Sequence, residues 1–263
     1  GNRWGGAGKR CDGTGRRVCT RGDGEGSGCT RRARDVTSEG SRMSAVNTVE
    51  AAPGRVGTRI NNAGFGGYRP IEECDLSRVR TMFETNVFGL ARLTQLVLPQ
   101  MRRARSGRIV NIGSMGGRVT FPVGGYYHAT KYAVEAISDA LRVEVKPFGI
   151  DVILVEPGLI RSNFEGRINE SLEVEAARHG TGGTATAYAN LLSANEKSTT
   201  GGYANDFVAT GPESVAAVIV KALQSRRPRA RYVVTPAAKA MITLRRFGGD
   251  RVWDATMRRQ LGL

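Results

Sequence analysis

Apolar residues recur along the middle of this chain with two different periods. From Asp75 to about residue 103 they are spaced three or four apart, which predicts a helix that is capped by Asp75 and broken near Pro99. Short apolar runs at 108–112 and 151–155 predict buried strands, and a second helical pattern lies between them. Strands and helices that alternate in this way predict an α/β fold, a doubly wound parallel sheet with helices on both faces.

On the N-terminal side this pattern weakens. Residues 1–34 hold ten glycines and nine basic residues but almost no large apolar side chains, so they offer no face to bury. We expect this Arg/Gly-rich segment to be anomalous or disordered, and residues 35–263 to form a single domain. A short helical pattern follows, capped by Ser38 or Ser41. Residues 55–60 then predict a strand that is poor in branched apolar side chains.

On the C-terminal side the pattern is interrupted once. Residues 159–206 form a polar insertion rich in Gly, Thr, Ala and Ser. Insertions at the carboxyl edge of such a sheet commonly cover the ligand crevice, so we assign this one to substrate. The chain then predicts a helix from Pro212, a strand at 231–234 and basic helical surface structure over 236–261.

Composition adds limits on location and cysteine chemistry. No run of about 18 apolar residues occurs and the start lacks the apolar block of a signal peptide, so we expect a cytoplasmic protein without a membrane span. The four cysteines show no metal-type CxxC pairing. We expect free thiols and no metal site.

The net charge of +15 raises the question of nucleic acid or anionic membrane as a partner. The excess lies at the two ends: residues 1–34 carry nine basic and three acidic residues, and residues 225–263 carry ten basic and two acidic. A near-neutral core with basic ends is more typical of solvated termini than of a binding face. Nucleic acid is therefore not favoured, and polyanion binding stays as the minority alternative.

The candidate chemistry centres on Tyr127 and Lys131. Both lie in the helical pattern between the two strands, one turn apart and on the same face. An ammonium at close range favours the ionised form of a phenol, which lowers its pKa and makes Tyr127 an acid or base usable near neutral pH. A Tyr and a Lys at this spacing are common in helices, so the pair alone is weak support for an active site.

Further motifs give the pair a context. These pieces are Asn61-Asn62-Ala63-Gly64, Asn86 in Thr85-Asn86-Val87-Phe88-Gly89, Ser114 in Asn111-Ile112-Gly113-Ser114, Tyr127 with Lys131, and Pro157-Gly158-Leu159-Ile160-Arg161-Ser162. With these pieces, the chain from about Asp35 to its end resembles the classical short-chain dehydrogenase/reductases, and its tail resembles the branch with the hydroxysteroid and retinol dehydrogenases. The order and separation of the pieces also agree with the family.

The resemblance implies an NAD(P)-dependent oxidoreductase that interconverts an alcohol and a carbonyl by hydride transfer. Tyr127 would be the acid or base, and Ser114 would stabilise charge on the substrate oxygen. Lys131 would lower the pKa of Tyr127 and hold the nicotinamide ribose, and Asn86 would position a relay water. Taken singly, Asn86 and Ser114 also fit structural roles in a helix and a turn.

The resemblance also implies where NAD or NADP binds, without selecting between them. Asp35 and Asn61 would face the adenosine half, Ala63 and Gly64 would let the cofactor approach the backbone, and Ser162 would hold the nicotinamide carboxamide. Asn61 alternatively fits a structural role at a strand end. The complete set of expected cofactor contacts is Asp35, Asn61, Ala63, Gly64, Tyr127, Lys131, Pro157, Gly158, Ile160 and Ser162. A small alcohol or carbonyl substrate and a homodimer or homotetramer are implied as partners.

The chain departs from the family at its start. The family opens with a strand and a glycine-rich turn that binds the pyrophosphate, and residues 1–34 contain no such motif. We expect the first strand and this turn to be missing, as from a truncated start and an out-of-frame reading. A catalytically inactive scaffold or partner-binding protein without a competent cofactor site is therefore the alternative function.

Overall fold

The computed structural model describes residues 16–17, 33–50, 56–162 and 187–262. Its centre is a four-stranded parallel sheet in the order β3-β4-β5-β8. The elements are β1 (Arg16–Arg17), β2 (Ala33–Arg34), α1 (Glu39–Glu50), β3 (Thr58–Asn61), η1 (Ile71–Glu73), α2 (Leu76–Phe83), the π-helical segment η2 (Glu84–Phe88), α3 (Gly89–Arg103), β4 (Gly107–Ile112), η3 (Met115–Gly117), α4 (Gly125–Glu144), η4 (Lys146–Phe148), β5 (Ile150–Glu156), β6 (Leu159–Ile160), α6 (Ala189–Ala204), β7 (Ala209–Thr210), α7 (Pro212–Gln224), β8 (Arg231–Val233) and α8 (Pro236–Leu261).

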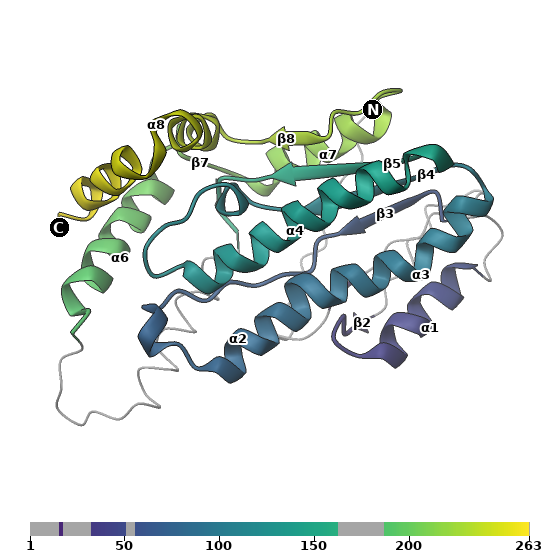
Figure 1. Ribbon diagram of the computed structural model, residues 1–263, viewed down its shortest axis with the longest axis horizontal. Coiled ribbons are helices and arrows are strands. Elements are labelled where there is room, and N and C mark those ends of the chain that lie inside the picture. The colour runs from purple at the N-terminus through teal and green to yellow at the C-terminus, as the bar shows by residue number, and fades with distance from the viewer. Residues whose placement is uncertain (1–15, 18–32, 51–55, 163–186, 263) are drawn as a thin grey trace.

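Helices cover both faces of the sheet, as the alternating pattern predicts (Figure 1). Ile109 of β4 and Val152 of β5 point into one core, which they share with α1, α3 and α4. Their neighbours Val110 and Ile153 point into a second core against α7. Successive side chains of a strand face opposite ways, so two central strands buried on both faces need continuous apolar runs.

The edge strand β3 is the weakest part of the sheet. It spans only four residues, and Ile60 is 39% exposed. Within the described ranges no strand pairs with its outer edge. The expected absence of a first strand and glycine-rich turn concerns residues 1–34, of which only 16–17 and 33–34 are described. These two pairs form the short antiparallel strands β1 and β2.

The helix before β4 differs from its prediction. Asp75 caps it as expected, with its carboxylate accepting from the Ser77 N–H at 2.8 Å. Pro99, however, does not break it, because α3 continues to Arg103. A proline inside a helix removes one hydrogen bond, and here Val97 and Met101 on either side of it are fully packed in the core. Burial therefore outweighs the local cost.

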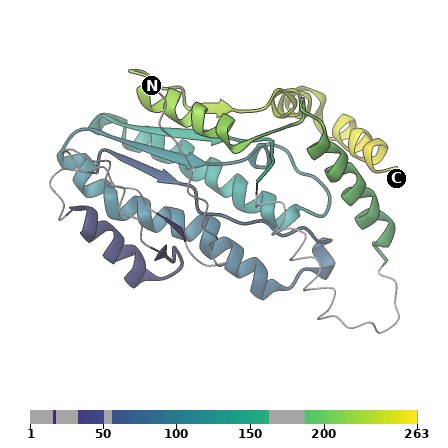
Figure 2. The same cartoon turned by 180° about the vertical axis from the view of Figure 1, so that it is seen from behind.

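The C-terminal elements lie at one end of the sheet. α8 is two helical pieces that meet at Gly249, whose φ is 67°, and α6 packs against it (Figures 1 and 2). α6 belongs to the insertion predicted over 159–206, of which residues 163–186 lie outside the described ranges. Of the four cysteines expected to be free thiols, Cys74 is described, and its Sγ donates to the carbonyl oxygen of Arg69 at 3.8 Å. No helix in the described part of the chain is long and apolar enough to cross a membrane.

Candidate active site

Tyr127 and Lys131 lie on the first two turns of α4 and share one face of it, as their spacing predicts. The helix begins after Gly124, whose carbonyl accepts from the His128 N–H at 2.9 Å. Both side chains are buried, at 7% and 8% exposed. The Lys131 ammonium lies 5.9 Å from the centroid of the Tyr127 ring. The helix therefore brings a phenol and an amine together in a site with little access to water.

Lys131 is anchored to the sheet by one of its three N–H donors. Its Nζ donates to the carbonyl oxygen of Ile112, the last residue of β4, at 3.0 Å. Burial lowers the pKa of Lys131 to about 8, and the negative charge of Glu135 acts in the opposite direction. Among the described residues no other acceptor binds this ammonium. Two N–H groups are thus available to a ligand's hydroxyl or anionic oxygens.

The pKa of Tyr127 differs from the expectation. Burial raises the pKa to about 12, and a hydrogen bond with the Ser114 side chain opposes this increase. The nearest cation, Lys131, is held on the Ile112 carbonyl, so it does not depress the pKa of Tyr127 in the protein alone. Desolvation outweighs the helix spacing.

Ser114 reaches Tyr127 from the turn that follows β4. Its extended backbone precedes η3, and its Oγ accepts from the Gly116 N–H at 3.0 Å. The same hydroxyl lies close enough to Tyr127 to oppose the increase in its pKa. The carboxyl end of β4 therefore supplies both the Ser114 hydroxyl and the carbonyl that holds Lys131, which brings three of the four predicted catalytic residues together.

Asn86, the fourth, lies in the π-helical segment η2 and is buried. Its amide binds the Phe65 backbone at both ends, with Oδ1 accepting at 3.0 Å and Nδ2 donating at 2.9 Å. Nδ2 also donates to Thr130 Oγ1 at 3.0 Å. In this arrangement Asn86 joins the loop after β3 to α4. Its expected role in a water relay stays a prediction.

The segment after β3 lies beside this group. A Cβ on Gly64 would lie 3.2 Å from Asn86 Oδ1 and 3.7 Å from Lys131 Nζ, and Ala63 is half-buried against the core. Asn61 is buried, and its Nδ2 donates to Asn111 Oδ1 at 2.8 Å and to Thr94 Oγ1 at 3.2 Å. These bonds hold β3 against its neighbours. They match the structural alternative for Asn61, while its cofactor contact remains a prediction.

The remaining predicted cofactor contacts are divided between two places. Pro157 follows β5, and its carbonyl accepts from the Met115 N–H at 2.9 Å, which ties it to the Ser114 turn. Gly158 packs against Thr235 so closely that a Cβ would overlap the threonine hydroxyl. Ile160 pairs with β7, and Ser162 is exposed beyond it. Asp35 lies elsewhere, exposed ahead of α1, where its carboxylate accepts from the Thr37 N–H at 2.8 Å.

Three aromatic residues at the site are missed by the sequence reasoning. The rings of Tyr68 and His128 have centroids 5.8 and 5.5 Å from that of Tyr127. The charge of Tyr203 on α6 contributes to the raised pKa of Tyr127. Tyr68 and Tyr203 lie in loop and insertion sequence without periodicity, so the sequence gives no signal for them. Sequence reasoning assigns no chemistry to His128, because it lies off the Tyr127 face of the helix.

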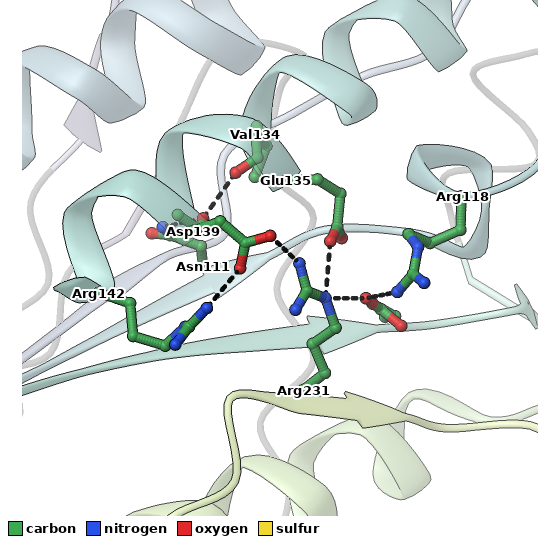
Figure 3. A network of polar contacts seen from close by, with 9 residues as sticks. Asn111, Arg118, Val134, Glu135, Asp139, Arg142 and Arg231 are labelled. Atoms are coloured by element: carbon green, nitrogen blue, oxygen red, sulfur yellow. Dashed lines mark hydrogen bonds and ion pairs between the residues drawn. The ribbon is translucent and has the colours of Figure 1, made fainter.

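A buried ionic cluster behind Lys131 is also missed. Arg231 Nε lies 3.0 Å from Glu135 Oε2 and 3.2 Å from Glu156 Oε1, and its NH2 lies 2.5 Å from Asp139 (Figure 3). Glu135 Oε1 and Glu156 Oε2 are buried without a hydrogen-bond partner among the described residues. Burial and the charge of Glu156 raise the pKa of Glu135 to about 8, against the effect of Arg231. A charged residue in each apolar run, at 135 and 156, is the signal that could have identified this cluster.

Comparison with known proteins identifies the family of this chain. Residues 13–173 match the short chain dehydrogenase family. The chain belongs to this family. The match begins inside the Arg/Gly-rich segment, ahead of the domain start expected at residue 35.

The short-chain dehydrogenase/reductase similarity extends beyond the matched residues. The chain is 32% identical over 229 residues to an uncharacterized oxidoreductase from Schizosaccharomyces pombe, covering 87% of this chain and 91% of the relative. It is 33% identical over 213 residues to retinol dehydrogenase 8 from Bos taurus, covering 79% and 66%. A short-chain dehydrogenase structure from Streptomyces avermitilis matches with a TM-score of 0.68 and 32% identity, covering 88% of this chain and 78% of that one.

Two other structural neighbours are complexes with a nicotinamide cofactor. One from Burkholderia phymatum was solved with NAD and matches with a TM-score of 0.65 and 23% identity over 81% of this chain and 73% of that one. A serine dehydrogenase was solved with NADP+ and matches with a TM-score of 0.62 and 23% identity over 78% and 74%. At this identity the likeness concerns the fold.

Proposed function

We propose that this short-chain dehydrogenase/reductase interconverts an alcohol and a carbonyl with NAD or NADP, and that Tyr127 is its acid or base. The observation that carries the proposal is the convergence of Ser114, Tyr127 and Lys131 at the carboxyl end of β4. Ser114 is held by the Gly116 N–H and Lys131 by the Ile112 carbonyl, Ser114 affects the pKa of Tyr127, and Tyr127 and Lys131 are buried. A proton donor, a hydroxyl beside it and a cation with spare donors suit chemistry at a polarised C–O bond.

Each residue has a role that follows from its surroundings. With a pKa of about 12, Tyr127 is protonated at neutral pH and is set to donate to a carbonyl oxygen during reduction. Ser114 favours the resulting phenolate, because its hydrogen bond lowers the pKa of Tyr127. Lys131 contributes a nearby positive charge while it is protonated. In the oxidation direction Tyr127 must first lose its proton, and its phenolate, which Ser114 favours, then accepts the alcohol proton.

Three features near Tyr127 fit a nicotinamide dinucleotide. Lys131 keeps two N–H donors for ribose hydroxyls, and Gly64 leaves only backbone beside Asn86 and Lys131. The Pro157 carbonyl accepts from the Met115 N–H, which fixes the start of the segment that leads to Ser162. When bound, the nicotinamide supplies or takes up the hydride. The expected contacts of Asp35 and Asn61 with the adenosine half belong to the same proposal.

The pyrophosphate half is where the alternative function enters. The glycine-rich turn of the family is not found in residues 1–34, and a dinucleotide without it loses backbone N–H donors for its phosphates. A chain that folds but holds no cofactor would be the inactive scaffold. For the substrate, α6 and the rest of the insertion at 159–206 are the segment we assign, because Tyr203 lies near enough to affect Tyr127.

The test is a titration of the purified chain with NADH and with NADPH, followed by nicotinamide fluorescence and by turnover of a panel of ketones and secondary alcohols. We expect binding of one cofactor and reduction of at least one ketone. Absence of cofactor binding at about millimolar concentration would mean a binding free energy weaker than about 4 kcal/mol. That result would favour the catalytically inactive scaffold. Light scattering on the same sample measures whether the chain forms the expected homodimer or homotetramer.

A further inference from the structure

His128 occupies a tight space directly after Tyr127 on α4. Its side chain is 3% exposed. It lies between two glycines, Gly116 and Gly124: a Cβ on the first would overlap Nδ1, and a Cβ on the second would lie 2.5 Å from Nε2. Tyr68 and Phe121 close the remaining sides, with ring centroids 6.4 and 5.6 Å from the imidazole. The ring therefore has one orientation available to it.

The hydrogen bond of this imidazole defines its tautomer. Nδ1 lies 3.1 Å from the carbonyl oxygen of Gly116. A carbonyl only accepts, so Nδ1 carries the proton. Burial lowers the pKa of His128 to about 4, which keeps the ring neutral at physiological pH. Nε2 is left without a partner among the described residues.

The residue that His128 binds is also the one that holds Ser114. The Gly116 N–H donates to Ser114 Oγ at 3.0 Å, and its C=O accepts from His128. The Ser114 side chain in turn lies beside Tyr127 and opposes the increase in its pKa. His128 thus contacts Gly116, Gly116 contacts Ser114, and Ser114 lies beside Tyr127, the residue that precedes His128 on α4.

Because the Gly116 N–H occupies one lone pair of Ser114 Oγ, it limits the directions left for the Ser114 O–H. We propose that His128 is a positioning residue that fixes the backbone of Gly116 through its carbonyl, and so aims the Ser114 hydroxyl at Tyr127. The inference rests on the proposed function for its catalytic consequence. Its structural half, the Nδ1–H tautomer bound to Gly116, is independent of that function.

The structural half is tested by NMR. The chain contains two histidines, His128 and His179, so ¹⁵N-histidine labelling with a His179→Gln sample for assignment gives an unambiguous spectrum. We expect His128 to remain neutral with the proton on Nδ1 from pH 5 to 8. A proton on Nε2, or titration near the ordinary pKa of 6.5, would overturn the proposal whether or not the chain is an enzyme.

The catalytic half is tested by two substitutions at one site. His128→Leu removes the donor, whereas the side-chain amide introduced by His128→Asn places a nitrogen close to the position of Nδ1 and can restore it. We expect His128→Leu to lower kcat about tenfold with cofactor affinity and KM unchanged, and His128→Asn to stay within about threefold of the parent. Equal loss in both variants would contradict a role for the hydrogen bond.

A double-mutant cycle separates positioning from packing. In a Ser114→Ala background there is no hydroxyl to aim, so His128→Leu should have no further effect on kcat. The same tenfold loss in that background would show that His128 acts through packing and overturn the proposal. If the parent chain neither binds cofactor nor turns over, the proposed function fails while the NMR result still decides the His128–Gly116 arrangement.

Discussion

Arg231 on β8 and Glu135 on α4 meet with 3.0 Å between Nε and Oε2, one helical turn beyond Lys131. The contact joins the helix that carries Tyr127 to the strand at the far edge of the sheet. Arg231 also reaches Asp139 and Glu156, so one guanidinium serves three carboxylates (Figure 3). Buried charges without a partner are strongly unfavourable, and the cluster therefore depends on this residue.

Arg231→Met is expected to destabilise the fold by about 2–4 kcal/mol at pH 7.5, because it removes the cation paired with buried Glu135 and leaves Glu156 with only Arg118, at 3.5 Å. Urea unfolding measures the change. Arg142→Met is the matched control, since Arg142 pairs with Asp139 where both side chains are largely exposed, at 40% and 44%. The control should cost less than about 1 kcal/mol. Equal costs would refute the dependence of the cluster on Arg231.

Glu135 should make the protein less stable as the pH rises. Its pKa is raised from 4.5 to about 8, so between these values the native state binds a proton more readily than the unfolded chain. Glu135→Gln should remove up to about 2 kcal/mol of this loss between pH 6.5 and 8. Below pH 6.5 the lowered pKa of His128 acts in the opposite direction, so the comparison starts at that pH. The opposing rise from Lys131, whose pKa is lowered to about 8, is present in the parent and the variant alike. Exposed Glu144→Gln on the same helix is the control, and unfolding free energies that change equally with pH in both variants would contradict the assignment.

Lys131→Met should separate stability from function. Burial lowers the pKa of Lys131 from 10.5 to about 8, which means that the folded state disfavours its charge. Removing the amine should raise the free energy of unfolding by about 1–2 kcal/mol at pH 7, after the loss of the hydrogen bond to Ile112. It should also weaken binding of reduced cofactor at least about tenfold. A variant that is both less stable and unchanged in cofactor affinity would oppose both halves of this prediction.

In the parent, the unfolded chain binds more protons than the native state between pH 8 and 10.5, because the native pKa of Lys131 is the lower one. Stability contributed by this residue therefore rises with pH through that window. The rise should be absent from Lys131→Met when both proteins are unfolded at pH 8, 9 and 10.

Tyr127→Phe should abolish turnover, by about a thousandfold or more, with cofactor affinity within about threefold of the parent, because only the acid or base is removed. Steady-state kinetics and nicotinamide fluorescence provide the two readouts. Tyr132→Phe is the control, since Tyr132 lies on the same helix and is 42% exposed. Retention of most activity in Tyr127→Phe would rule out its catalytic role.

Local periodicity is sufficient for the elements that build this site. The runs that form β4 and β5 are predicted within about two residues, because a strand buried on both faces has a distinctive composition. The helix that forms α4 is predicted between them. The same reasoning fails at Pro99, where core burial outweighs a local preference.

The site itself is predictable only in part. The Tyr127 and Lys131 spacing places both side chains on one face, but it does not predict the burial that raises the pKa of Tyr127 to about 12. His128 escapes notice because helix geometry points it away from that face, whereas its partner Gly116 comes from another element. Contacts between elements distant in sequence leave no periodic signal, and Arg231 with Glu135 is a second example.

The π-helical segment η2 changes how α2 and α3 relate to each other. One wide turn inserts the equivalent of one extra residue, which advances the angular phase of everything beyond it by about 100° relative to an uninterrupted helix. Both helices can thus keep their own apolar faces on the core while Asn86 is turned inward at the junction. Removing a single residue from this turn would rotate Leu93 and Val97 out of the core. The position of Asn86 and the packing of α3 therefore depend on the same wide turn.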